Sequence, residues 1–179
     1  FARNVIPHVP NIKSVIKGIS NLIEPKLGIG AIEFHYGSII QKEIHYDSIY
    51  HEHYFYFTIL ILSNLLKKYG LFSFDIEKSP ISGGSLVIFF SKQNRTKSKI
   101  LKSYEKKELQ GKTNSIYKWS EFGNSSRNHS KKLKTIIENE NKKNKSKLIA
   151  YGASARSSTL LNFLKISNKH ISYILDKNN

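Results

Sequence analysis

Residues 71–90, LFSFDIEKSPISGGSLVIFF, predict two β-strands joined by a short turn. Apolar and polar residues alternate over 71–77, which is the two-residue period of a strand, and the apolar run over 86–90 predicts a second strand. Gly83 and Gly84 mark the turn between them. This connection is too short for a parallel crossover, so we expect the two strands to pair antiparallel.

A helix, a buried strand and a second helix are predicted before this pair. Apolar residues recur at helical spacing over 12–23, directly after Asn11, whose side chain can cap the first helix. The short apolar run over 29–34 predicts a buried strand. Thr58 is expected to cap the second helix, which should end at Gly70. The stretch between the strand and Thr58 is polar, aromatic and rich in histidine, and it shows no clean period.

The character of the chain changes after residue 92, where lysine becomes frequent. The elements predicted there are helices over 98–111 and 128–144 with Trp119 packing between them, a strand over 147–151, a small-residue turn over 152–155, a helix over 157–164 and a strand over 170–175. A strand, a helix and a strand in succession form a βαβ unit, which implies a parallel sheet. We therefore predict an α/β domain over 1–92 and a second, incomplete α/β domain over 93–179, with a helical linker over 93–146.

Composition limits the classes of function. The 179 residues carry a net charge of +16, but only four of the 29 basic residues are arginine, the residue best suited to reading nucleic acid. We therefore expect solvated lysine-rich helices and no nucleic-acid partner.

The chain has no cysteine, no signal-peptide pattern and no apolar run of about 18 residues or more, so we expect a cytoplasmic protein without disulfides or a membrane span. Because it begins at Phe1 and contains no methionine, we expect a fragment of a longer protein.

The segment Tyr50-His51-Glu52-His53-Tyr54 is the densest group of residues that could do chemistry. Histidine titrates near neutral pH, and a neighbouring carboxylate can orient it, so acid–base catalysis is one interpretation. On an extended segment, the two histidines would share one side and the other three residues the opposite side. The alternative is a polar cluster that seals a loop. The histidines are two residues apart and lack a clear third ligand, so we predict no metal site.

Three further segments could bind a ligand. His8 follows a predicted strand end, where ligands bind in α/β sheets, although it could also simply pack between two prolines. The turn Gly152-Ala153-Ser154 precedes a helix and could admit a phosphate, with Arg156 as a charged donor; a tight turn without a ligand is the alternative. The glycines before Ser85 could permit close approach of a ligand or only form the turn.

Taken in order and at these separations, four segments resemble the sugar C-methyltransferases of deoxysugar biosynthesis. They are Asn4 to Pro10, Ile49-Tyr50-His51-Glu52-His53, Gly83-Gly84-Ser85-Leu86, and Ala150 to Asn162. The resemblance implies a small cysteine-rich zinc domain, a class I methyltransferase domain with a Rossmann-like sheet, and a C-terminal α/β domain. It places the start of this chain at about the fourth strand of the methyltransferase sheet. Zinc and the glycine-rich loop for S-adenosylmethionine are then expected outside this chain, which alone should be inactive.

The resemblance also implies residue roles. The substrate would be a nucleotide-linked 4-keto-6-deoxyhexose, converted to an enolate that takes up the methyl group. His53 would be the base, Glu52 would position or polarise a neighbour, and Tyr50 and His8 would contact the sugar or steady the enolate oxygen. The residues expected to bind substrate are His51, Gly83, Gly84, Ser85, Tyr151, Gly152, Ala153, Ser154, Arg156 and Asn162.

The chain departs from the family pattern at two places. Val87 stands where arginine is common, and Arg156-Ser157-Ser158 replaces Lys-Gly-Asn. Two other functions fit the residues: a non-catalytic module that binds a sugar nucleotide or a partner protein, and methyl transfer to a small non-sugar acceptor. Nothing in the sequence indicates an oligomeric state.

Overall fold

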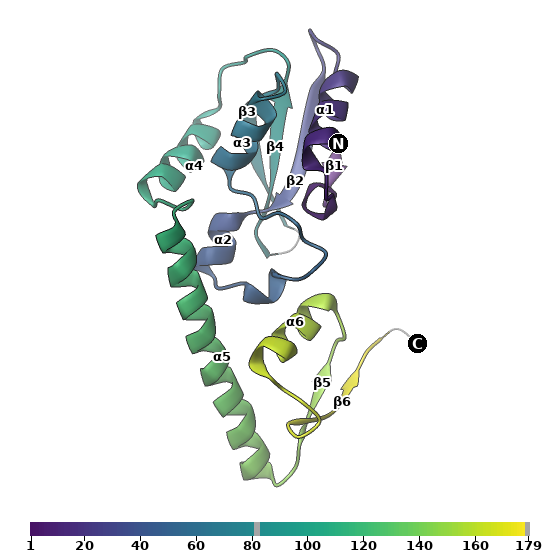
Figure 1. Cartoon of the computed structure of the whole chain (residues 1–179), viewed down its shortest axis with the longest axis vertical. Helices are drawn as coiled ribbons and strands as arrows, with labels where there is room; N and C mark the ends of the chain where they lie inside the picture. Colours follow the sequence, from purple (N-terminus) through teal and green to yellow (C-terminus); the bar gives the residue numbers. More distant parts are fainter. Residues whose placement is uncertain (81–82, 178–179) are drawn as a thin grey trace. The chain divides into compact units, whose positions relative to one another are not determined.

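The computed structural model describes residues 1–80 and 83–177, which form two compact units (Figure 1). Unit 1 comprises Phe1–Lys42 and His51–Trp119, and unit 2 comprises Glu43–Tyr50 and Ser120–Asn179. The chain therefore leaves unit 1 after Lys42, contributes a short segment to unit 2 and returns. The domain boundary expected at residue 92 stays a prediction.

In the described part of unit 1, four strands form one mixed sheet with the order β1-β2-β4-β3. Strand β1 (Ala2–Arg3) runs parallel to β2 (Ile29–His35). Strand β4 (Ser85–Ser91) is antiparallel both to β2 and to β3 (Phe72–Ser79). The antiparallel pairing expected for residues 71–90 is confirmed. The last strand lies between the two strands that precede it in the chain, which is compatible with the α/β Rossmann-like fold expected from the sequence.

The two capped helices of unit 1 are also confirmed. Helix α1 (Ile12–Leu22) begins after Asn11, whose side chain accepts a hydrogen bond from the backbone of the third following residue at 3.2 Å. Helix α3 (Ile59–Lys67) begins after Thr58 in the same way. Gly70 follows α3 with φ +71°, a left-handed conformation that glycine adopts without steric cost.

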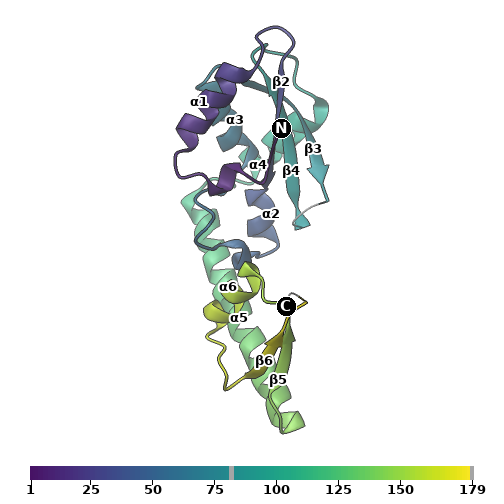
Figure 2. The same cartoon turned by 90° about the vertical axis from the view of Figure 1, so that its right-hand side faces the viewer.

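The core of unit 1 lies between one face of the sheet and three helices, α1, α3 and α4 (Lys99–Gln110) (Figure 2). Ile16 and Leu62 from the helices and Ile32 and Ile88 from the sheet are completely buried. Burying each such side chain contributes about 1.5–3 kcal/mol relative to leaving it exposed. The neighbouring positions on these strands point to the opposite face, where Glu33 of β2 is paired in register with Val87 of β4.

The histidine-rich stretch before Thr58 contains short helices that its aperiodic sequence did not predict. Helix α2 spans Gly37–Lys42, and a single 3-10 turn, η2, spans Tyr46–Ser48. Another 3-10 turn, η1, spans Ile6–His8 in the loop after β1. Each is too short to produce a recognisable hydrophobic period.

Unit 2 contains the predicted βαβ unit. Strand β5 (Leu148–Tyr151), helix α6 (Ala155–Leu164) and β6 (Ile171–Leu175) follow one another, and β5 pairs parallel with β6. The long helix α5 (Ile116–Asn144) begins well before the expected residue 128, so Trp119 lies inside this helix rather than between two helices. Among the described residues, no helix is long and apolar enough to cross a membrane.

Candidate functional site

The candidate residues of unit 1 come from loops at one edge of its sheet. Strands β1 and β2 are parallel, so their carboxyl ends meet at the same edge. The loop after β1 starts at Asn4, a residue type that tolerates its φ of +53°, and carries His8 on η1. Strand β4 begins at this edge, because Ser85 is paired in register with His35 at the end of β2. The position expected for His8, in a loop after a strand end, is thus confirmed.

His8 and His53 are brought together in this loop region. Their ring centroids are 4.7 Å apart, with the planes inclined at 65° in an edge-to-face arrangement. The two segments are joined by a backbone hydrogen bond of 2.8 Å from the N–H of Tyr54 to the carbonyl of Pro7. The ring centroid of Tyr56 lies 5.7 Å from that of His53. Two histidines that are 45 residues apart in the sequence therefore form one half-buried pair.

One hydrogen bond fixes the tautomer of His8. Its Nδ1 lies 3.1 Å from the backbone carbonyl oxygen of Glu52. A carbonyl oxygen only accepts, so Nδ1 must carry the proton. In the neutral form of His8, Nε2 is then an acceptor, suited to a hydroxyl donor.

The Tyr50–Tyr54 segment is not extended throughout. His51 and Glu52 form an exposed turn, so side chains do not alternate between two sides there. The boundary between the two units falls at this point: Tyr50 belongs to unit 2, whereas His51, Glu52 and His53 belong to unit 1. A turn rather than a strand forms because the chain bends back to place His53 beside the loop after β1.

The glycines before β4 have a packing role. A Cβ on Gly84 would lie 2.6 Å from Cγ2 of Ile39, and the φ of Gly84 is +137°, a conformation strained for any other residue. The carbonyl of Gly84 accepts a hydrogen bond of 3.3 Å from the N–H of Tyr36, at the end of β2. Gly83 is exposed, with φ +64°. Close packing explains the need for glycine at position 84, while ligand contact by Gly83, Gly84 and Ser85 stays a prediction.

Glu33 is a buried carboxylate near the same edge that the sequence reasoning missed. Its side chain is 5% exposed and lies 2.9 Å from Nε of Arg3. The hydroxyl of Ser79 donates to its other oxygen at 2.5 Å. An acidic residue inside the apolar run Ile32–Phe34 was the available signal, because a carboxylate in a buried strand needs such partners.

Glu108 is a second buried carboxylate, and it anchors the end of the histidine-rich stretch. Its two oxygens accept hydrogen bonds from the backbone N–H groups of Ile59 at 2.7 Å and Leu60 at 2.9 Å, in the first turn of α3. The hydroxyl of Tyr36 also donates to it. Burial raises the pKa of Glu108, and the two backbone hydrogen bonds oppose this shift. The network fixes the start of α3 a few residues after His53.

In unit 2 the predicted small-residue turn connects β5 to α6. Gly152 has φ +97° and donates to the carbonyl of Leu175 at 2.7 Å. The N–H of Ala153 donates to Oδ2 of Asp176 at 3.2 Å, and Ser154 caps α6. The turn thus forms as expected, with Asp176 as a neighbour that the sequence reasoning did not include. Two other residues expected to bind substrate, Tyr151 and Asn162, are exposed on β5 and α6.

Arg156 is already engaged by a carboxylate. Its Nε and Nη2 lie 2.8 and 2.7 Å from Oδ2 of Asp47, a residue of η2. Next to Asp47, the ring of Tyr46 packs 4.8 Å from that of Phe163 on α6, and its hydroxyl lies 3.0 Å from Nδ1 of His129 on α5. Burial raises the pKa of Tyr46, and the charge of Asp47 adds to this. The hydroxyl of Tyr46 is therefore neutral at physiological pH.

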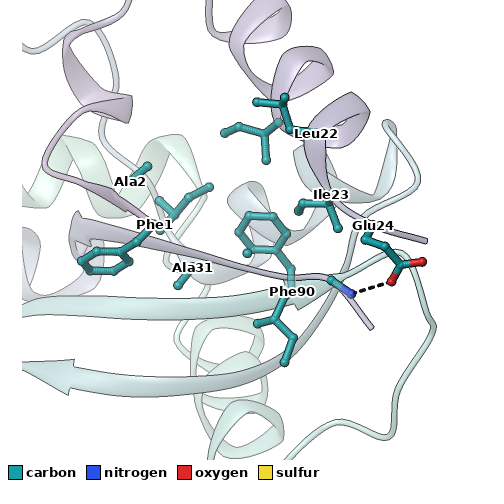
Figure 3. A pocket seen from close by; sticks show the side chains of 12 residues that line it. Phe1, Ala2, Leu22, Ile23, Glu24, Ala31 and Phe90 are labelled. Atoms are coloured by element: carbon teal, nitrogen blue, oxygen red, sulfur yellow. Dashed lines mark hydrogen bonds between the residues drawn. The ribbon is translucent and has the colours of Figure 1, made fainter. Parts of the chain in front are cut away.

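A groove of about 410 Å³ lies elsewhere in unit 1, between α1 and the start of β2 (Figure 3). Its walls are mainly apolar and include Ala2, Leu22, Ile23 and Phe90, with Glu24 at the rim. It contains none of the residues predicted for the site.

The described residues do not provide a site for a resident metal or for the family's cofactor loop. Within residues 1–80 and 83–177, no group of three or more histidine, cysteine, aspartate or glutamate residues could hold a metal ion. In the described part of unit 1, the strand-to-helix loop after β1 contains prolines and His8 rather than a glycine-rich sequence. The residues present therefore do not fit the loop that would hold S-adenosylmethionine.

Comparison with known proteins relates the chain to C-methyltransferases. Residues 80–179 match the family model described as the C-methyltransferase C-terminal domain. Over 89 residues, the chain is 34% identical to the C-methyltransferase NovU of Streptomyces niveus, an alignment that covers 50% of this chain and 21% of that protein. The match thus spans about a fifth of the length of this relative.

Proposed function

Because the chain belongs to the C-methyltransferase family, as a protein with the C-methyltransferase C-terminal domain, we propose that it acts in the C-methylation of a nucleotide-linked 4-keto-6-deoxyhexose. The observation that carries the proposal is the pairing of His8 with His53 beside the carboxyl edge of the sheet. This is where an α/β sheet binds its ligands, and it holds an imidazole suited to proton transfer near neutral pH.

His53 is the proposed base. A neutral imidazole nitrogen of His53 takes the proton from the carbon next to the ketone, and the electron pair of the broken C–H bond forms the enolate. The edge-to-face contact with His8 and the neighbouring ring of Tyr56 restrict the orientation of the His53 ring. S-adenosylmethionine would supply the electrophilic methyl group for that carbon, although the described residues do not provide the loop that would hold it.

The remaining roles follow from the hydrogen bonds available. His8 in its neutral form offers Nε2 as an acceptor, so we assign it to a hydroxyl group of the sugar rather than to the enolate oxygen. We assign the enolate oxygen to Tyr50, whose hydroxyl is a donor. We assign the exposed carboxylate of Glu52 to positioning His51 or a sugar hydroxyl.

The nucleotide is proposed to bind in unit 2. The turn at Gly152 and Ala153, together with Ser154 at the start of α6 and Arg156 in its first turn, is assigned to the diphosphate. The proposal places the protein in the cytoplasm, with a sugar nucleotide as its partner rather than nucleic acid. It rests on family resemblance for the identity and the place of the ligand, and on Arg156 as a charged donor in the first turn of α6.

Proton exchange tests this function without the cofactor. The chain is incubated in D₂O with thymidine diphospho-4-keto-6-deoxyglucose, and deuterium at the carbon next to the ketone is followed by NMR. The chain alone is expected not to transfer a methyl group, but proton removal needs no methyl donor, so the proposal predicts exchange faster than in a control without protein. Binding of the sugar nucleotide without added exchange would instead support the non-catalytic binding module, and an absence of binding would favour a non-sugar acceptor.

A further inference from the structure

A short segment next to the proposed catalytic residues is held by unit 2. The segment Glu43–Tyr50 belongs to that unit, and Oδ2 of Asp47 in its middle accepts a hydrogen bond from Nε of Arg156 and forms an ion pair with its Nη2. The side chain of Asp47 is 26% exposed and that of Arg156 is 41% exposed, so the pair is partly shielded from water. The rings of Tyr46 and Phe163 pack beside it. These contacts tie the segment to α6.

The backbone at the start of this segment is strained. Ile44 has φ +57°, a left-handed conformation that is rare for a β-branched residue. Such strain persists only where surrounding contacts hold the chain in place. The conformation of the segment is therefore held by its contacts and not by the intrinsic backbone preference of its residues. Because Tyr50 lies three residues after Asp47, these contacts contribute to the path of the chain into the residue proposed to act on the enolate.

We propose that Asp47 is a positioning residue, which transmits nucleotide binding at the first turn of α6 to the segment that carries Tyr50. This inference rests on the proposed function for the identity of the nucleotide, but the anchoring by Asp47 is independent of it. Asp47 has no direct role in the chemistry. It acts by holding Arg156 and, through this pair, the η2 turn.

The guanidinium of Arg156 can serve Asp47 and a diphosphate together. A guanidinium has five N–H donors, and the pair with Asp47 uses one on Nε and one on Nη2. The Nη1 donors remain for a phosphate oxygen at the neighbouring turn. A bound diphosphate would order the arginine, and the ordered arginine would hold Asp47 more tightly. The coupling is reciprocal, so the same pair must strengthen nucleotide binding.

Amide hydrogen exchange tests the anchoring without any ligand. The N–H groups of Ser48 and Ile49 are bonded to the carbonyls of His45 and Tyr46, so their exchange reports opening of η2. We compare the full chain with its Asp47→Asn variant, and we use Glu43→Gln as a matched control, because that carboxylate contacts His45 in its own segment. The proposal predicts that the amides of Ser48 and Ile49 exchange about fivefold faster in Asp47→Asn. This factor corresponds to the upper end of what a partly exposed ion pair contributes to stability. Equal exchange in both variants would overturn it.

Thymidine diphosphate then tests the transmission. Adding this probe should slow the exchange of Ser48 and Ile49 in the native chain but not in Asp47→Asn, and it should bind the variant about fivefold more weakly. A purely structural role for Asp47 would leave the ligand effect intact in the variant and would contradict the proposal. If the native chain does not bind the probe, the proposed nucleotide ligand and its transmission both fail. The exchange of the ligand-free variant still decides whether Asp47 anchors the segment.

Discussion

Replacing Glu108 by glutamine should reveal how much the buried carboxylate contributes to unit 1. Glutamine keeps the volume but has one side-chain oxygen, so it can accept from only one of the N–H groups of Ile59 and Leu60. The other N–H would face the amide NH₂, itself a donor. An unpaired buried donor costs about 1–3 kcal/mol, and relief of carboxylate desolvation offsets part of this loss. We expect the free energy of unfolding at pH 7 to fall by about 2 kcal/mol.

The pH dependence of this loss has a defined sign. Burial raises the pKa of Glu108 in the folded state, so the folded protein binds its proton more tightly than the unfolded chain does. The contribution of this group to stability is therefore fully present below the unfolded pKa, near 4.5, and is lost as pH rises through the folded pKa. Glutamine does not titrate. The stability difference between native protein and variant should thus widen as pH is lowered from 7 toward 5.

Urea unfolding monitored by circular dichroism, at several values of pH, measures both effects. Glu105→Gln is the matched control, because Glu105 lies on the same helix and pairs with the partly exposed Lys97, an interaction worth at most about 1 kcal/mol. Two results would refute the reasoning about Glu108: a loss no greater than that of the control, or a stability difference that does not change with pH.

Substitutions at Gly84 and Glu33 test the contacts beside the site, with Gly18 as the control position for Gly84. Gly84→Ala should destabilise the protein by about 2–4 kcal/mol, because the new Cβ meets Ile39 and the backbone is strained, whereas Gly18→Ala, in open space on α1, should stabilise it by about 0.5–1 kcal/mol. Denaturant midpoints check both, and equal effects at the two positions would contradict the packing role. Glu33→Gln should lower the free energy of unfolding by about 1–2 kcal/mol, because the hydrogen bond from the hydroxyl of Ser79 is weaker to an amide than to a carboxylate. An unchanged free energy of unfolding would show that this buried hydrogen bond contributes nothing.

Much of the fold follows from local signals in the sequence. Asn11 and Thr58 mark helix starts because their side chains accept hydrogen bonds from the first turn. The hairpin of residues 71–90 was predictable because its two strands are joined by a connection too short for a crossover. The start of helix α5 was predicted too late in the chain, because Gly123 and the buried Ser126 interrupt the apolar pattern there.

The candidate site was predictable only in its parts. The segments around His8 and His53 stood out by residue type, but their contact depends on a chain path that local periodicity does not encode. The same holds for Asp47 and Arg156, which are 109 residues apart in the sequence. Glu108 lies in a lysine-rich amphipathic helix, where a glutamate normally faces water, so its burial at the start of α3 gave no local signal.

The exchange of the sugar's alpha proton in the His53→Ala variant tests the central claim most directly. The variant is compared in D₂O with the native chain and with His170→Ala, a histidine bonded within the loop before β6 and outside the proposed site. If His53 is the base, its loss should slow exchange by about 100-fold or more, while His170→Ala keeps the native rate. Binding of the sugar nucleotide should persist in both variants, which separates the chemistry from binding. Exchange at the native rate in His53→Ala would contradict the account, because the proton would then be removed by another group.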